Sequence, residues 1–216
     1  MWNNFKRFLF EFVIVTLGVL AAFSISKLDE NRKLRAEELA SYKSLKEDLE
    51  AELYVFNYYK QPLKNAKAYL KPILAKQYDE IDSLMSYLNA SFDLQERNAT
   101  YINLKFSGKL EILHNEAIKK RMTLYYETYY QGLESISQWN YDFRLHFLMP
   151  FLVKNLKYND DKENLLRFLN NDEFLNLIQS QYQMTESNIS TIEKSEKLIA
   201  RIIEEIDKEL GVEVED

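Results

Sequence analysis

The chain has few of the residues that make turns, with only four Gly and three Pro among its 216 residues. Average usage, about 7% Gly and 5% Pro, predicts roughly twenty-six of them in a chain of this length. Because Gly and Pro interrupt regular elements, such a chain has long elements and few connections. This argues against β-sandwiches, barrels and propellers, which need a turn about every 8–12 residues. We therefore predict an all-α fold.

Cysteine is absent and only two His are present. The first absence excludes disulfides, thiolate metal sites and Cys nucleophiles, and the second leaves little material for a metal centre. Four scattered Gly cannot build a phosphate-cradling loop, and no Ser stands in a Gly-rich nucleophile elbow. The net charge of −6 makes the chain a poor partner for nucleic acid. The composition predicts a protein that is not an enzyme and has no cofactor.

One long apolar run stands near the N-terminus, with Glu11 as its single charge. A helix from Phe8 to Ile25 is about 27 Å long at 1.5 Å per residue. That length just spans a bilayer core of about 30 Å. The sequence therefore predicts a short cytoplasmic tail over 1–7, a transmembrane helix over 8–26 and the lipid bilayer as a partner.

A cleaved signal peptide is the alternative interpretation of this run. Phe12–Phe23 would be its apolar region and Ser24–Ser26 its cleavage site. We favour an uncleaved anchor because an amphipathic helical pattern follows Ser26 without any turn signal. Glu11 lies one turn inside the apolar run, where its carboxylate can reach the headgroups or pair with nearby basic residues. Its alternative role is an intramembrane functional acid.

Small residues line one side of the expected membrane helix. Gly18, Ala21 and Ala22 form a small-xxx-small pattern, which lets two membrane helices approach closely. We consider these three residues a candidate helix–helix interface. The alternative is ordinary composition, because Gly and Ala are common in membrane helices.

Helical patterns and breaks continue along the rest of the chain. An apolar stripe with spacings of three and four includes Tyr42, Leu45 and Leu49, while Glu38 borders a charged face typical of solvent exposure. Pro62 predicts the end of this first long helix at Gln61. A broken helical pair over 62–90, a loop over 91–98, and a short helix over 100–107 closed by Gly108 are expected to follow.

Two further long helices are expected after this. Asn115 is a candidate N-cap for a helix that continues to about Asn155, with a kink at Pro150. After a connection over 158–161, Asn171 caps the last helix and Gly211 ends it. The chain thus predicts an elongated helical bundle over 27–210, with coiled-coil-like narrow stripes and an acidic tail over 211–216.

Tyrosines recur at spacing four in the pairs Tyr125-Tyr126 and Tyr129-Tyr130. With Tyr101 and Arg121, Tyr125 and Tyr129 form a candidate ligand pocket. The alternative is aromatic core packing with the hydroxyl groups at the surface. A sensory or ligand-binding bundle is therefore the second hypothesis for function.

Only one spacing suggests a metal. Glu111 and His114 stand three residues apart, as in the motifs of di-iron bundles, which need two such motifs and two further Glu. The only other His, His146, follows Phe143 at that spacing. Half a motif favours chance spacing, and we predict no metal site.

Two blocks of residues carry a family resemblance, and the first has the spacing Glu11-x6-Gly18-x3-Ala22-x7-Glu30. The second block is Thr100-Tyr101-x2-Leu104-x2-Ser107-Gly108-x-Leu110, followed by Asn115, Ile118, Arg121 and Tyr125-Tyr126. Together they resemble a family of bacterial single-pass membrane proteins with a domain of unknown function, over most of residues 10–130. The chain departs from the family pattern at 26–30, which lacks the family's Trp. The resemblance implies an inner-membrane anchor and a helical domain, and it implies no reaction.

Basic residues flank the apolar run on both sides, so the positive-inside rule does not choose an orientation. Together with the resemblance, a signal anchor predicts the bacterial inner membrane, with the bulk of the chain in the periplasm. The leading hypothesis is a non-enzymatic protein that acts by self-association or as an accessory subunit of a cell-envelope complex.

Overall fold

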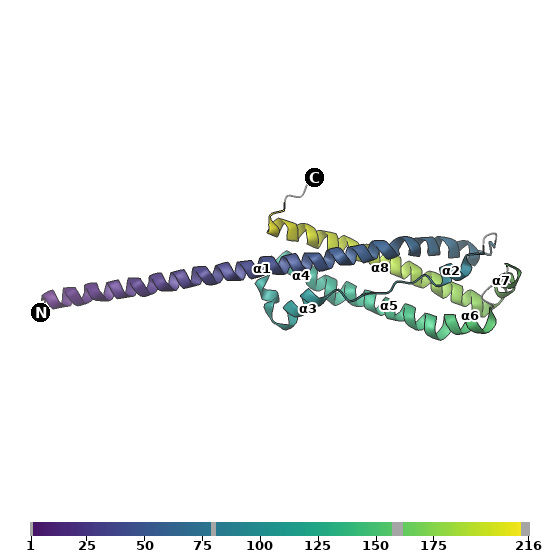
Figure 1. The fold of residues 1–216 in the computed structure, drawn as a ribbon, viewed down its shortest axis with the longest axis horizontal. Helices are drawn as coiled ribbons and strands as arrows, with labels where there is room; N and C mark the ends of the chain where they lie inside the picture. Colours follow the sequence, from purple (N-terminus) through teal and green to yellow (C-terminus); the bar gives the residue numbers. More distant parts are fainter. Residues whose placement is uncertain (1, 79–80, 157–161, 213–216) are drawn as a thin grey trace.

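The computed structural model describes residues 2–78, 81–156 and 162–212. These residues form helices and connections and contain no strand, so the all-α prediction is confirmed. The first helix extends far beyond the others, which pack against its second half (Figure 1). An N-terminal apolar helix therefore continues into an elongated bundle. The expected connection over 158–161 and most of the acidic tail lie outside the described residues.

The first helix, α1, runs from Trp2 to Leu74, so the prediction that it ends at Pro62 is wrong. Proline has no N–H to donate to the carbonyl one turn earlier, and this normally disrupts a helix interior. Here Pro62 and Tyr58 are exposed, so the carbonyl without a donor lies on the solvent side. Leu63 and Ala66 pack in the core immediately afterwards and hold the helix in place. Tertiary packing thus overrides the local preference of proline.

The end of α1 follows Pro72 by two residues. Lys76 adopts a left-handed φ of 60°, and the Gln77 N–H donates to the Pro72 carbonyl at 3.0 Å. This is the closing hydrogen bond of a Schellman motif, with Lys in the position usually taken by Gly. The predicted helical pair over 62–90 is therefore the end of α1 followed by one short helix, α2 (Leu84–Leu88).

The next stretch follows the sequence prediction closely. Residues 90–98 have no regular secondary structure, and we call them the extended segment because they run along the bundle (Figure 1). The helix α3 spans Ala99–Phe106. Gly108 then takes a left-handed φ of 71° before the 3-10 turn η1 (Lys109–Ile112). The predicted loop and the short helix closed by Gly108 are confirmed.

A continuous helix runs from Glu116 to Asn155 in five parts. Its parts are α4 (Glu116–Leu124), the π-helical η2 (Tyr125–Tyr130), α5 (Gln131–Phe143), the π-helical η3 (Arg144–Leu148) and α6 (Met149–Asn155). Asn115 caps it as predicted, because its side chain accepts from the Ala117 and Ile118 N–H groups at 3.0 and 3.2 Å. Pro150 cannot donate to the turn before it, and the widened turn η3 lies immediately ahead of this proline.

The last long helix, α8, spans Asp172–Leu210 and follows the short α7 (Lys162–Phe168). The Asn171 side chain accepts from the Glu173 N–H at 2.8 Å, and Gly211 ends the helix with a left-handed φ of 71°. Both predicted caps are confirmed. In Figure 1, α8 runs back along α1 and ends near the point where α1 enters the bundle.

The bundle has two apolar clusters along its length. The proximal cluster, nearer the exposed half of α1, has members from α1, α3, α4, η2, α5 and α8 and includes Tyr42, Leu49, Phe56, Tyr125, Ile192 and Ile202. The distal cluster includes Leu70, Ile73, Leu88, Leu148, Phe151, Phe174 and Ile178. The helices α5 and α8 also carry four buried polar residues, each at most 3% exposed: Asn140, Gln181, Thr185 and Asn188.

Side chains satisfy the backbone of the extended segment 90–98. Gln181 donates to the Ala90 carbonyl at 2.5 Å, and the Leu94 N–H donates to the Ser137 hydroxyl at 3.0 Å. The Arg97 N–H donates to the Tyr130 hydroxyl at 2.9 Å. Buried backbone N–H and C=O groups need hydrogen-bond partners. The backbone groups of the neighbouring helices are already paired within each helix, so they cannot bond to this segment. Polar side chains of η2, α5 and α8 therefore fix this segment against the bundle.

Charge pairs join α1 to α8 along their antiparallel contact. Lys46 Nζ lies 2.6 Å from Asp207 Oδ1, Lys60 Nζ lies 2.6 Å from Glu196 Oε1, and Lys67 Nζ lies 2.7 Å from Glu186 Oε1. Lysines of α1 thus face acidic residues of α8. Each pair is partly exposed, so its individual contribution to stability is small. A shift of one helix along the other would break this matching.

Candidate functional site at the base of the bundle

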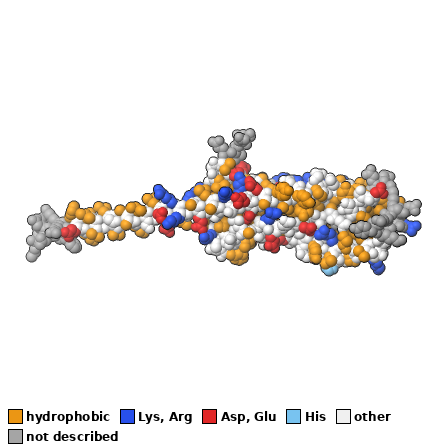
Figure 2. All heavy atoms as spheres, viewed as in Figure 1, with side chains coloured by type: hydrophobic (Ala, Val, Ile, Leu, Met, Phe, Trp, Pro, Cys, Tyr) orange, Lys and Arg blue, Asp and Glu red, His pale blue; other side chains and the backbone are white. Residues whose placement is uncertain are grey.

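The first half of α1 carries an exposed apolar segment, Phe10–Leu28. Its large apolar side chains are between 45% exposed at Val13 and 68% exposed at Ile25. Figure 2 shows this segment as a thin apolar rod that ends in a cluster of charged residues at the bundle. Among the described residues, α1 is the one helix long and apolar enough to cross a membrane. Soluble surfaces rarely expose so much apolar area, so this segment needs lipid or a partner.

Two hydroxyl groups of the exposed apolar segment hydrogen-bond to its own backbone. The Thr16 hydroxyl donates to the Phe12 carbonyl at 2.8 Å, and the Ser24 hydroxyl donates to the Leu20 carbonyl at 2.8 Å. Such bonds inside one helix are what an apolar environment requires.

The predicted helix–helix interface lies on this segment. Gly18, Ala21 and Ala22 are exposed, and a Cβ added at Gly18 would meet no atom within 4 Å. Glu11 is exposed at the start of the segment. The bundle leaves this small-residue face uncovered, so a second helix has room to contact it.

A short exposed spacer, residues 29–36, separates the apolar segment from the bundle. Charges of both signs stand on it, and Lys33 pairs with Asp29 at 2.7 Å. Burial begins at Glu38, whose side chain is 1% exposed. The prediction that this glutamate borders a solvent face is therefore wrong.

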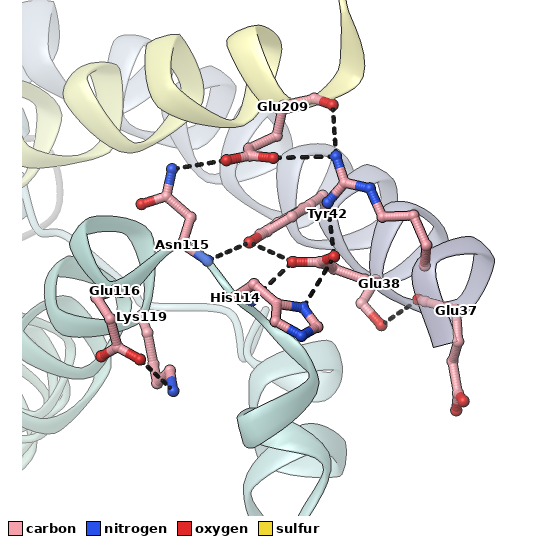
Figure 3. A network of polar contacts seen from close by, with 10 residues as sticks. Glu37, Glu38, Tyr42, His114, Asn115, Glu116, Lys119 and Glu209 are labelled. Carbon is pink, nitrogen blue, oxygen red and sulfur yellow. Dashed lines mark hydrogen bonds and ion pairs between the residues drawn. The ribbon is translucent and has the colours of Figure 1, made fainter. Parts of the chain in front are cut away.

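Glu38 is the centre of the polar network drawn in Figure 3. Its Oε1 accepts from the His114 N–H at 2.7 Å and from the Tyr42 hydroxyl at 3.1 Å. Its Oε2 accepts from Arg35 Nη1 at 2.6 Å and lies 3.2 Å from His114 Nδ1. Burial alone raises the pKa of Glu38, but the hydrogen bonds from His114, Arg35 and Tyr42 together hold that pKa below its usual value.

The same network reaches the end of α8 through Glu209. Arg35 Nη2 lies 3.1 Å from Glu209 Oε2, and Asn115 Nδ2 donates to Glu209 Oε1 at 2.9 Å. The Asn115 N–H donates to the buried Tyr42 hydroxyl at 3.2 Å. We call Arg35, Glu38, Tyr42, His114, Asn115 and Glu209 the junction. It joins α1, the start of α4 and the end of α8 at the base of the bundle.

Ion pairs surround the junction. Lys109 pairs with Glu37, and Lys119 Nζ lies 2.9 Å from both Glu111 Oε2 and Glu116 Oε1. Glu111 and His114 therefore have different partners and do not share one helix face, because His114 follows the end of η1.

The residues of the predicted ligand pocket lie in different surroundings. Tyr101 is 1% exposed, stacks on Tyr126 at 4.5 Å and donates to Glu127 Oε1 at 2.8 Å. Tyr125 is completely buried, Arg121 pairs with Glu205 on α8, and Tyr129 is partly buried against the proximal cluster.

A small cavity of about 210 Å³ lies beside Tyr101, Tyr126 and Tyr130, and its lining does not include Arg121, Tyr125 or Tyr129. The structure thus brings the tyrosines together mainly as core.

The sequence prediction does not include the burial of two glutamates, although the spacing of α1 carries a signal for both. Glu38 and Glu52 fall on the same four-three spacing as the buried Tyr42, Leu45 and Leu49 of α1. A glutamate at a core position of such a stripe needs a partner elsewhere in the chain. For Glu38 these partners come from the junction.

Comparisons with protein-family models, with curated proteins and with solved structures gave no match. The family resemblance of the two sequence blocks stays a prediction.

Proposed function

We propose that this chain is a single-pass membrane protein that holds a helical bundle at a fixed height above the bilayer and acts by association. Its partner is a second copy or another protein of the cell envelope. No step of the proposed function involves catalysis.

The observation that carries this proposal is the continuity of α1. One helix provides the exposed apolar segment, the spacer and one whole wall of the bundle. From Leu28 to Glu38 the helix advances roughly 15 Å at 1.5 Å per residue. The junction then fixes the bundle to α1 at the first buried position. A bundle attached in this way moves with its anchor as one body.

We further propose that the anchor stays uncleaved in a bacterial inner membrane, with the bundle outside the cytoplasm. The alternative cleavage site, Ser24–Ser26, lies inside unbroken helix in the structure. The absence of cysteine permits a direct test of orientation. A single cysteine at Glu50, whose side chain is 54% exposed, should react with a membrane-impermeant maleimide in intact spheroplasts. A cysteine at Asn3 should react only after lysis, and the reverse pattern would overturn the orientation.

Association is tested in the full chain by crosslinking in native membranes, with mass spectrometry of the captured species. The exposed face at Gly18 gives a sharp variant, because Gly18→Ile fills the small-residue face. Thr16→Ile places the same side chain on roughly the opposite side of the helix and is the matched control.

Loss of the self-crosslinked or hetero-crosslinked species in Gly18→Ile but not in Thr16→Ile would support the proposal. A strictly monomeric, partner-free protein in native membranes would overturn the proposal. If the wild type, Gly18→Ile and Thr16→Ile all give the same crosslinked species, only the proposed role of the Gly18 face in the membrane would be overturned.

A further inference from the structure

Glu52 lies inside the bundle without the partners that Glu38 has. Its side chain is 2% exposed, and neither carboxylate oxygen has a hydrogen-bond partner among the described residues. It stands on α1 in the middle of the proximal cluster, between the buried Leu49 and Phe56. An ionised carboxylate in such surroundings is costly, since the water it loses is not replaced.

Two further polar groups near Glu52 are also unpartnered. The Tyr125 hydroxyl on η2 and Arg97 Nε on the extended segment are buried and make no hydrogen bond of normal geometry within the described part of the chain. The Tyr125 hydroxyl nevertheless lies close enough to the Glu52 carboxyl to lower its pKa. The head group of Arg97 instead donates to Gln95 Oε1 at 3.1 Å. Three neighbouring elements thus each bring one unsatisfied group to the same region.

The charged and titratable groups around Glu52 come from several elements. Asp48 is one turn earlier on α1 and accepts from the Thr100 N–H at 3.2 Å. Arg97 attracts the Glu52 charge from the extended segment, where Glu96 also lies, and η2 presents Tyr125, Tyr126 and Tyr130, with Glu134 just beyond. From α8 the proximal cluster receives aliphatic side chains, among them Ile199 and Ile202, and α8 also carries the buried Ser195, whose hydroxyl has no partner among the described residues. One cation therefore opposes several acids.

Burial raises the pKa of Glu52 to about 7, although Arg97 acts in the opposite direction. Burial and the charge of Glu52 also raise the pKa of Tyr125, so its hydroxyl stays protonated. A neutral Glu52 carboxyl carries one donor and is compatible with the apolar cluster, whereas the carboxylate is not.

The π-helical turn η2 lies directly against this carboxyl. Residues five apart share a face in a π-helix, and so Tyr125 and Tyr130 both reach the core, at 0% and 2% exposure. In a regular α-helix these two side chains would diverge by about 140°. A change of η2 toward α-helical spacing would withdraw one tyrosine and admit water to Glu52. Turns of this kind often occur at functional sites.

We propose that Glu52 is a proton-binding site that controls the packing of η2 against α1. With the proton bound, the bundle is closed as described. When the proton leaves, η2 loosens and exposes Glu52 to solvent. This regulatory device is independent of the partner assigned above, because it concerns only the bundle.

Hydrogen exchange of the full chain in nanodiscs, corrected for the intrinsic pH dependence of exchange, tests the proposal. The open state has a Glu52 pKa near 4.5 and the closed state near 7, so the opening constant should rise about tenfold per pH unit between these values. Protection of a peptide covering 125–131 should therefore fall about tenfold per pH unit between pH 5 and 7. Above pH 7 the protection should no longer change.

The Glu52→Gln variant should show protection that does not change with pH. The control Glu50→Gln, on the exposed side of α1, should behave as the wild type. Protection of 125–131 that is independent of pH in the wild type, or an unchanged pH dependence in Glu52→Gln, would overturn the proposal.

A second measurement does not depend on the folding of that variant. The wild-type infrared spectrum at pH 6 should contain the carbonyl band of a buried protonated carboxyl, and this band should disappear on titration to pH 8. Tyr125→Phe removes a hydroxyl that favours the ionised form, so it should move the disappearance to higher pH. A spectrum without the buried carboxyl band at pH 6 would contradict the proton site.

Discussion

Asn140 on α5 and Asn188 on α8 hydrogen-bond to each other inside the bundle, with Nδ2 and Oδ1 3.2 Å apart. Asn140 also lies 3.5 Å from the Phe92 carbonyl of the extended segment. Both side chains are at most 3% exposed. A buried polar pair of this kind is satisfied in one register only, so it selects the alignment of α5, α8 and the extended segment.

Replacement of one member of this pair should be more harmful than replacement of both. Asn188→Leu leaves Asn140 with a lost partner, which should reduce the free energy of unfolding by about 1–3 kcal/mol. Asn140→Leu/Asn188→Leu should recover much of this loss. Urea unfolding followed by circular dichroism gives the values, and Gln138→Leu on the exposed face is the control. Additive single effects would show that the pair is not coupled.

The junction should be sensitive to acid. Because hydrogen bonds lower the pKa of Glu38, its contribution to stability is present above the unfolded pKa of about 4.5 and is lost as pH falls through the lower folded value. Glu38→Ala should reduce stability at pH 7 by about 1.5–3 kcal/mol, the range for hydrogen bonds to charged groups. The difference from wild type should shrink below pH 4. Glu47→Ala, on the exposed face of α1, should change little.

Glu52 should give the opposite dependence on pH. Its folded pKa of about 7 lies above the unfolded 4.5, so its contribution to stability is fully present below pH 4.5 and is lost as pH rises through 7. Glu52→Gln should therefore match the wild type near pH 5 and exceed it by about 3 kcal/mol at pH 8. Thermal unfolding at both pH values measures this. A Gln variant that is less stable than the wild type at pH 8 would show that the carboxylate has a partner.

Pro62 should limit the stability of α1. Pro62→Ala restores an N–H donor inside a continuous helix, and proline in a helix interior costs about 3 kcal/mol relative to Ala. We expect a gain of about 1–3 kcal/mol in the free energy of unfolding, visible as a higher Tm. An unchanged or lower Tm would indicate a helix break at this position.

Local signals in the sequence predicted much of the fold. Asn115 and Asn171 are caps because their side chains reach N–H groups two or three residues away, and Gly108 and Gly211 take left-handed φ values. Such effects depend on neighbouring residues alone. The predicted helix end at Pro62 is wrong because core packing of Leu63 and Ala66, set by distant helices, exceeds the local penalty of the proline.

The junction was not predictable in the same way. Glu38 is buried because His114 and Arg35 supply its hydrogen bonds, and His114 is 76 residues away in the chain. When its hydrogen-bond partner is unknown, a glutamate on an apolar stripe is predicted to be an exposed surface residue. The tyrosine pairs show the same limit, since only the π-helical form of η2 reveals that Tyr125 and Tyr130 both enter the core.

Because α1 is unbroken, the directions in which side chains of its exposed half and of its bundle half point about the helix axis are fixed relative to each other. At 100° per residue, Tyr54 and Tyr58 point in the same directions as Gly18 and Ala22 on an ideal helix. Tyr54 and Tyr58 are 75% and 68% exposed, on the side of α1 away from the bundle. Two copies that met through Gly18 would therefore stand back to back, with these tyrosines between them and both bundles facing outward. One inserted residue in the spacer would turn the bundles by about 100° and uncouple the two contacts.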